Sequence, residues 1–464
     1  MAALLQFPTE ILDQILGHLP CADLAALYRV HRTFHLAAEP LLYNSVELSW
    51  TKKENPPVVQ LLRTILTRPA LALHVGQVKL LGRDFDLTRR TPDPHGIIRN
   101  LPPKVTIASD EQKIFTDAIE DLPLPYVSSW EEELRAGTMD AMVALLLMSV
   151  PNIKSLRIES NFTIEARLVG NLFRSAVCER SGTDLPSFVD LQEVIYNSKH
   201  SQFRGRCFPQ GNTHEVLPLF YLPAARSLDL FVDTPPSGVF DWPPGPPNLS
   251  NLTSLRLSML RETSLKKVLS ATPCLKSLRW EWYYGPSYSR LPWGQTINLD
   301  QVVSALVHVQ DTLESLDITA WADYGTPSDI ELDPLEIRGT LRPLASFPKL
   351  RNLTAPWCFV AGFAPDTGLR LEDVVPSSVE SLVLKNSLMS IDAWEWEDYE
   401  MVELFPPFFE NRRAVGRQLR ELEVVVKAGG ASTEWAETSV ARPRLAEICS
   451  GHNVKLKITT TRFL

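Results

Sequence analysis

A short string recurs along the chain and restricts the folds that the chain can adopt. Its six clearest copies begin at residues 154, 226, 253, 276, 314 and 380 and read KSLRI, RSLDL, TSLRL, KSLRW, ESLDI and ESLVL. Looser copies begin at 351 and 420, and weaker ones at 74 and 189. Leucine alternating with polar residues predicts a short strand with one buried face. One such unit has too little apolar surface to fold alone, so successive units must stack.

Helix-like segments separate the strings. MVALLLMSV, SLKKVLSAT and LDQVVSALVHVQD begin at residues 142, 264 and 299. A strand followed by a returning helix, repeated, predicts an α/β solenoid with a curved parallel sheet and helices on its convex side. The form Pro-x-Leu-x-Ser-Leu-x-Leu resembles leucine-rich repeats over residues 71–464. The spacing is irregular, from 23 residues (253 to 276) to 40 (380 to 420), and the Asn typical after the strand is missing, which predicts long inserts.

Charge and cysteine content limit the partners and the compartment. The 464 residues carry a net charge of −9, and basic residues form no run longer than a pair such as Arg89-Arg90. Nucleic-acid grooves need clustered Lys and Arg, so we expect no nucleic-acid partner. The six cysteines are isolated, as in reduced proteins, and the longest apolar run, residues 141–150, is too short to span a bilayer. We expect an intracellular protein of the cytoplasm or nucleus without a membrane partner.

No sequence pattern is typical of an enzyme. The chain lacks a glycine-rich phosphate loop, a G-x-S-x-G elbow and an H-E-x-x-H pair. His31 and His35 have a metal-ligand spacing for a helix, but no third ligand is near them in the sequence. We interpret them as part of a partly exposed helix face. We therefore expect no catalytic residue, no metal and no cofactor.

Two sets of residues are candidates for a binding surface on the repeats. The residues between the leucines have mixed charge, for example Arg279 and Asp317, which favours a self-paired surface or a mixed-charge protein partner. The second set is aromatic, and aromatic residues are enriched in binding hot spots. It is the predicted substrate contact and consists of Trp280, Trp282, Tyr283, Tyr284 and Trp293. The alternative for these rings is that they pack an insert onto the repeats.

The N-terminal stretch FPTEILDQILGHLPCADLAALYRV, residues 7–30, has two apolar helical stripes separated by Leu19-Pro20. Together with the segment after it, this stretch closely resembles the F-box. The matching residues are Phe7-Pro8-Thr9-Glu10-Ile11-Leu12, Ile15-Leu16, Leu19-Pro20, Asp23-Leu24, Leu27, Val30, Arg32, Phe34, Pro40 and Leu42-Tyr43. Three short helices in about 45 residues form a small core, and such modules gain stability from a partner.

The F-box resemblance implies a partner and a mechanism. F-boxes dock onto the Skp-type adaptor of a cullin–RING ubiquitin ligase, and the positions that match the family's interface are Phe7, Pro8, Ile11, Leu12, Ile15, Leu16, Leu19 and Leu24. We expect an F-box at 1–48, a linker and connecting helix at 49–70, and a substrate-recognition domain at 71–464. The first hypothesis is a substrate-recognition subunit of an SCF-type ligase, binding an unknown protein substrate. The alternatives are an F-box scaffold acting outside a cullin ligase and an enzyme with an unrecognised site.

Overall fold

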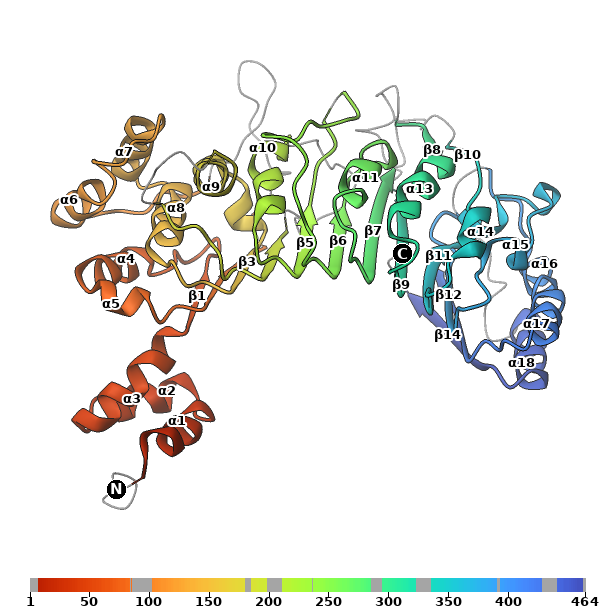
Figure 1. The fold of residues 1–464 in the computed structure, drawn as a ribbon, viewed down its shortest axis with the longest axis horizontal. Coiled ribbons are helices and arrows are strands. Elements are labelled where there is room, and N and C mark those ends of the chain that lie inside the picture. Colours follow the sequence, from red (N-terminus) through yellow and green to blue (C-terminus); the bar gives the residue numbers. More distant parts are fainter. Residues whose placement is uncertain are drawn as a thin grey trace. The chain divides into compact units, whose positions relative to one another are not determined.

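The protein is a mixed α/β chain that divides into two units. The computed structural model describes residues 7–83, 85, 102–179, 185–197, 211–235, 237–284, 294–322, 335–389, 393–427 and 440–461. Unit 1 comprises Met1–Gln202 and His214–Asp229, and unit 2 comprises Phe203–Thr213 and Leu230–Leu464. Figure 1 shows the elements of both units in chain order. The boundary between the units falls within α10 (Thr213–Val216) and β5 (Ser227–Phe231).

Unit 1 begins with three short helices and continues into parallel strands. Its helices are α1 (Thr9–Gly17), α2 (Cys21–Tyr28), α3 (Arg32–Tyr43), α4 (Val58–Thr67), α5 (Pro69–Ala72), α6 (Ser109–Asp117), α7 (Val127–Ala136), α8 (Met139–Ser149) and α9 (Arg167–Phe173). Its strands β1 (Ser45–Ser49), β2 (Gln77–Leu81), β3 (Ser155–Ile158) and β4 (Glu193–Tyr196) are neighbours in that order. Every pair is parallel, with Val78, Leu156 and Val194 in one row. These three side chains are buried, as the alternating pattern predicts.

Unit 2 repeats the same arrangement. Its strands follow the order β6 (Ser254–Ser258), β7 (Ser277–Tyr284), β9 (Ser315–Ala322), β11 (Asn352–Pro356), β12 (Ser381–Lys385), β13 (Glu421–Lys427) and β14 (Lys455–Thr461). Strands β8 (Thr296–Asn298) and β10 (Glu336–Arg338) form a separate parallel pair. The helices are α11 (Glu262–Leu269), α13 (Leu299–Leu306), α14 (Trp357–Ala361), α15 (Leu371–Val374), α16 (Asp398–Glu403), α17 (Phe405–Ala414) and α18 (Ala441–Gly451).

The predicted strings are all strands, and their leucines align across the sheet. In unit 2 the middle leucines form one row of residues 255, 278, 316, 353, 382, 422 and 456. The first six of these are at most 1% exposed. Three of these leucines are preceded by Ser254, Ser277 and Ser315, which are also in register. Equivalent positions in successive strings therefore occupy equivalent places in the sheet.

The sheet begins earlier than the sequence predicted. Residues 45–49 were assigned to the F-box and its linker, yet they form β1, which pairs with β2 along its whole length. Val46 and Leu48 alternate inward, at 7% and 3% exposure, in a strand too short to give a clear pattern. Strand β14 at the other end was also missed, since polar and apolar residues alternate there without the string's serine. Strand β1 is the edge strand of unit 1, and strand β14 is the edge strand of unit 2.

One asparagine that was thought to be missing is present. Asn161 lies three residues after Ile158, so an Asn does follow this strand, in the spacing Leu156-x-Ile158-x-x-Asn161. Its side chain is fully buried. The side-chain Nδ2 donates to the carbonyl of Trp50 at 2.6 Å, and Oδ1 accepts from the backbone N–H of Phe85 at 3.1 Å. The Asn161 side chain thus satisfies two backbone groups, one just after β1 and one after β2, which would otherwise be buried without a partner.

Candidate functional site: an exposed apolar face on α1

The first helix carries more apolar surface than the module around it can bury. Leu12 and Leu16 are one turn apart and only 3% and 2% exposed. Ile11 and Ile15 are also one turn apart, on the adjacent stripe, and are 39% and 38% exposed. An amphipathic helix normally has polar residues beside its buried stripe. On α1 the apolar face therefore extends past the buried stripe into solvent.

The local sequence explains why α1 begins where it does. Pro8 is the N-cap residue, and its carbonyl accepts hydrogen bonds from the N–H groups of Ile11 and Leu12, both at 3.1 Å. Glu10 lies in the first turn, where a negative charge is favoured by the helix dipole. Phe7 stands just before the helix and is 45% exposed, and Pro8 is exposed too. We call Phe7, Pro8, Ile11 and Ile15 the α1 face.

The module's core lies on the other side of α1. Leu16, Leu24 and Ala38 form a buried cluster, one residue from each of α1, α2 and α3. The partly buried residues packed on this cluster are Leu19, Leu27, Tyr28, Ala37, Leu41 and Leu42. Leu12 of α1 and Phe34 of α3 are buried too, so each of the three helices has only one or two buried side chains among those described. A core of this size cannot also cover a second stripe on α1.

The structure sorts the eight predicted adaptor residues into two groups. Phe7, Pro8, Ile11 and Ile15 are exposed and able to contact a partner. The other four lie inside the module: Leu12, Leu16 and Leu24 are buried and Leu19 is half-buried. Leu12, Leu16 and Leu24 therefore pack inside the module, whereas Leu19 keeps part of its side chain exposed. Sequence periodicity could not separate the two stripes, because both are apolar.

Two further exposed residues were not predicted for this site. Val30 is 50% exposed after α2, and Leu36 is 62% exposed on α3. Five of the twelve large apolar side chains that are exposed in the described part of the chain lie within residues 7–36. Val30 does belong to the quoted motif, so its place in the motif was the available signal. Exposed apolar residues concentrated in one small module are typical of a protein–protein contact.

The predicted aromatic contact is not an exposed surface. Trp280, Trp282 and Tyr284 are at most 1% exposed, and Tyr283 is 6% exposed. Trp282 stacks on Tyr284 with ring centroids 6.2 Å apart, and Trp280 donates from Nε1 to the carbonyl of Leu260 at 2.7 Å. These four residues belong to strand β7 and pack it against its neighbours, so they are neither an exposed contact nor part of an insert packed onto the repeats. The fifth predicted residue, Trp293, lies outside the described residues.

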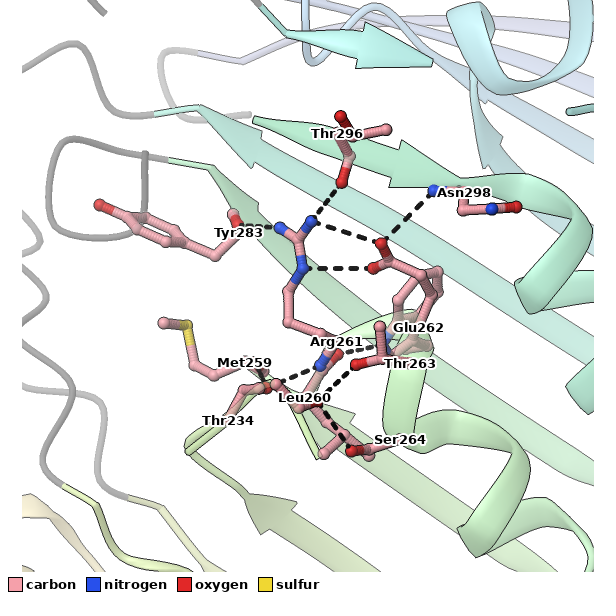
Figure 2. Close-up of polar contacts among 12 residues, drawn as sticks. Thr234, Met259, Leu260, Arg261, Glu262, Thr263, Ser264, Tyr283, Thr296 and Asn298 are labelled. Atoms are coloured by element: carbon pink, nitrogen blue, oxygen red, sulfur yellow. Dashed lines mark hydrogen bonds and ion pairs between the residues drawn. The ribbon is translucent and has the colours of Figure 1, made fainter. Parts of the chain in front are cut away.

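One polar cluster of unit 2 is a buried ion pair beside β7 (Figure 2). Arg261 and Glu262 are 2% and 3% exposed, with Arg261 Nε 3.2 Å from Glu262 Oε2. The guanidinium donates to the carbonyl of Thr296 at 2.6 Å and to that of Tyr283 at 3.4 Å. It also lies 4.7 Å from the ring centroid of Trp282. Arg261 therefore binds backbone at the ends of β7 and β8, and we interpret the pair as a structural tie.

Charged side chains on the polar face of the strands form ion pairs with one another. Arg256 lies 2.6 Å from Glu281, and Arg279 lies 3.4 Å from Asp317. Further along the row, Lys457 lies 2.8 Å from Glu423. The mixed charges read from the sequence are thus neighbours across the strands. Positive and negative side chains are therefore mixed along the described part of this face, and Glu281, at 3% exposure, is the buried member of its pairs.

The histidine pair of α3 has local partners. His31 Nδ1 accepts from the backbone N–H of Thr33 at 3.1 Å, which caps the start of α3. His35 stacks on Tyr28 with ring centroids 3.9 Å apart. Among the described residues no group of three or more His, Cys, Asp and Glu side chains is placed to hold a metal ion. Within the same residues, no helix has the length and apolarity needed to cross a bilayer.

Comparison with known proteins identifies the N-terminal module. Residues 4–49 match the family model described as F-box-like. No curated protein matches the chain. The matched range contains α1, α2, α3 and β1, and it includes the whole α1 face. The N-terminal helices are therefore an F-box-like domain, a class of module that generally binds Skp-type adaptors.

Proposed function

We propose that this protein is a substrate-recognition subunit of an SCF-type ubiquitin ligase. The observation that carries the proposal is the α1 face: an F-box-like domain whose Ile11 and Ile15 are more than one-third exposed beside a complete core. In this proposal the face docks onto a Skp-type adaptor, and the adaptor joins the chain to a cullin. The residues after the F-box hold a protein substrate.

The part that follows the F-box is proposed to be an irregular leucine-rich-repeat-like solenoid. Three observations support this. Within each unit the sheet strands follow chain order and pair in parallel, apart from the separate β8–β10 pair. The leucines of successive strings share one row, and Asn161 fills the buried position that the family spacing assigns to Asn. Repeats of this kind present an extended surface, which suits the binding of a protein substrate.

The proposed mechanism requires no bond-making residue in this chain. A subunit that holds the adaptor at one place and a substrate at another raises the effective concentration of substrate lysines near the ubiquitin donor. The chemistry then belongs to the other subunits. The roles of the α1 face and of the strands are binding and orientation.

The docking proposal is tested by charge insertion on α1. Ile11→Asp and Ile15→Asp place a carboxylate in the contact, while Gln14→Asp puts the same charge on an exposed position of the same helix. Loss of a central apolar contact typically costs at least about 2 kcal/mol, or about 30-fold in affinity. We expect each isoleucine variant to lose at least that much affinity for a purified Skp-type adaptor by calorimetry. Gln14→Asp should bind like the wild type.

The controls separate docking from folding and from ligase assembly. Circular dichroism should show native helix content in all three variants, since both isoleucines are already exposed. Wild-type affinity in the double variant Ile11→Asp/Ile15→Asp would refute the α1 face as the docking site. Recovery of cullin with the wild-type chain and adaptor supports the ligase role. Adaptor recovered without cullin would instead indicate a scaffold outside the ligase.

A further inference from the structure

One carboxylate of the F-box-like domain contacts the connecting helices that follow it. Glu39 lies on α3, and its Oε2 accepts from the Tyr28 hydroxyl at 3.0 Å and from Arg68 Nη2 at 2.8 Å. Tyr28 belongs to α2, whereas Arg68 lies between α4 and α5. His35 Nε2 stands 3.6 Å from the same oxygen. We call Tyr28, Glu39 and Arg68 the junction clamp.

The clamp bridges a junction that has almost no linker. Helix α3 ends at Tyr43 and strand β1 begins at Ser45, so a single residue, Asn44, separates the F-box-like helices from the sheet. The Asn44 carbonyl accepts from the N–H groups of Gly76 and Gln77, both at 2.9 Å. The chain therefore turns from helix to strand at a point held by backbone hydrogen bonds. A rotation of α3 about this point would move Glu39 relative to Arg68.

The clamp differs from an ordinary surface ion pair in its geometry. The Glu39 side chain is only 17% exposed, and a hydroxyl and a guanidinium both donate to one oxygen. The Tyr28 ring is itself fixed by stacking on His35. Burial alone would raise the pKa of Glu39, but the hydrogen bonds from Arg68 and Tyr28 outweigh it and the pKa is lowered. The surroundings of Glu39 therefore favour its ionised carboxylate.

We infer that the junction clamp fixes the orientation of the F-box-like domain on the strands of unit 1, with Glu39 and Arg68 as positioning residues. The biological role of this clamp rests on the proposed function, because a ligase subunit must hold its substrate at a defined place relative to the adaptor. The contact itself is a property of this chain alone. Loss of the clamp should leave adaptor docking intact and allow the module to swing.

The orientation is measured by pulsed electron paramagnetic resonance on the full chain. One spin label goes on the native Cys21 of α2, which is exposed, and the other on a cysteine that replaces the exposed Glu132 of α7. The other accessible or undescribed cysteines, at 178, 207 and 274, are replaced by Ser. In Glu39→Arg, where two cations face each other, we expect a broader interspin distance distribution with a shifted maximum. Restoration by Glu39→Arg/Arg68→Glu would show that the pair itself sets the orientation.

A matched control comes from the same region. Arg63 of α4 pairs with Glu111 at 3.1 Å and is 50% exposed, close to the 51% of Arg68, but both partners lie outside the F-box-like domain. Arg63→Glu should leave the distance distribution unchanged. A distribution in Glu39→Arg that matches the wild type would overturn the inference. So would a broadened distribution that the charge-swapped double variant fails to restore.

Adaptor affinity separates this inference from the proposed function. The clamp residues lie away from the α1 face in sequence, so Glu39→Arg should bind a purified Skp-type adaptor within about threefold of wild type. A larger loss that the double swap does not restore would mean that the module has unfolded, and would count against a positioning role. If the wild type itself binds no adaptor, the proposed function fails while the distance measurement still decides the clamp.

Discussion

Helix α1 and strand β7 are both rich in large apolar residues, yet they use them in opposite ways. On α1 the stripe of Ile11 and Ile15 remains exposed while Leu12 and Leu16 are buried. On β7 four consecutive residues that alternate between the two faces, Trp280 to Tyr283, are all buried. Helix α1 therefore presents apolar side chains to solvent, whereas these residues of β7 do not. The sequence alone predicted a partner contact at both.

The difference comes from what surrounds each element. Strand β7 has β6 on one side and β9 on the other. Its inward rings meet residues such as Phe359 of α14, and on the opposite face Tyr283 clusters with Phe231, Met259 and Trp321. Helix α1 shares one small buried cluster with α2 and α3. The number of packed neighbours, more than local hydrophobicity, decides which apolar residues remain exposed.

The largest expected effect tests the buried side of this comparison. Trp282→Ala removes a fully buried indole that contacts Tyr284, Phe359 and Arg261. Such truncations typically cost about 3–5 kcal/mol, because the cavity is only partly refilled. We expect urea unfolding monitored by circular dichroism to show a loss of this size. A loss below about 1 kcal/mol would mean that the ring is not packed as described.

The next prediction compares two neighbouring residues of α1. Leu12→Ala should destabilise the F-box-like domain by about 2–5 kcal/mol, since Leu12 is 3% exposed. Ile15→Ala should change stability by only about 0.5 kcal/mol, because that side chain already meets solvent. Hydrogen exchange of α1–α3 in the full chain measures both. Equal protection in the two variants would contradict the assignment of Leu12 to the core and of Ile15 to the α1 face.

The last prediction concerns a carboxyl group in a mostly apolar helix, and it tests a pH dependence of stability instead of the loss caused by one truncation. In α8 every residue from Met139 to Leu147 is buried, and Asp140 among them is 5% exposed. Its carboxylate accepts from the backbone N–H groups of Leu168 at 2.8 Å and Val169 at 3.1 Å, at the start of α9. Burial raises the pKa of Asp140 from 3.8 to about 7, although these two hydrogen bonds oppose the rise.

The sign of the pH dependence follows from that shift. Between pH 3.8 and about 7 the folded chain holds a proton on Asp140 that the unfolded chain has lost, so its contribution to stability falls as pH rises through this window. The slope is about 1 kcal/mol per pH unit within the window. We expect the free energy of unfolding to fall more from pH 5 to pH 8 in wild type than in Asp140→Asn. An equal fall in both would show that Asp140 does not titrate in this range.

The fold was predictable where one pattern repeats, and the site only in part. Every string with Leu alternation is a strand, because period-two burial needs no long-range information. Edge strands β1 and β14 lack the full string and were missed. The F-box motif located the module correctly, as the matching family model confirms. It did not show that Leu12, Leu16 and Leu24 are core residues.

The sequence by itself determined the positions of the strands that carry the repeated string, the order of apolar residues in α1–α3 and the presence of an F-box-like domain. Only the tertiary structure decided that Ile15 is exposed while Trp282 is buried, and that Glu39 meets Arg68 from 29 positions away. The physical reason is that periodicity is a property of one element, whereas exposure depends on how many other elements pack on it. Residues far apart in the sequence supply that packing, and no local sequence pattern indicates which of them will be in contact.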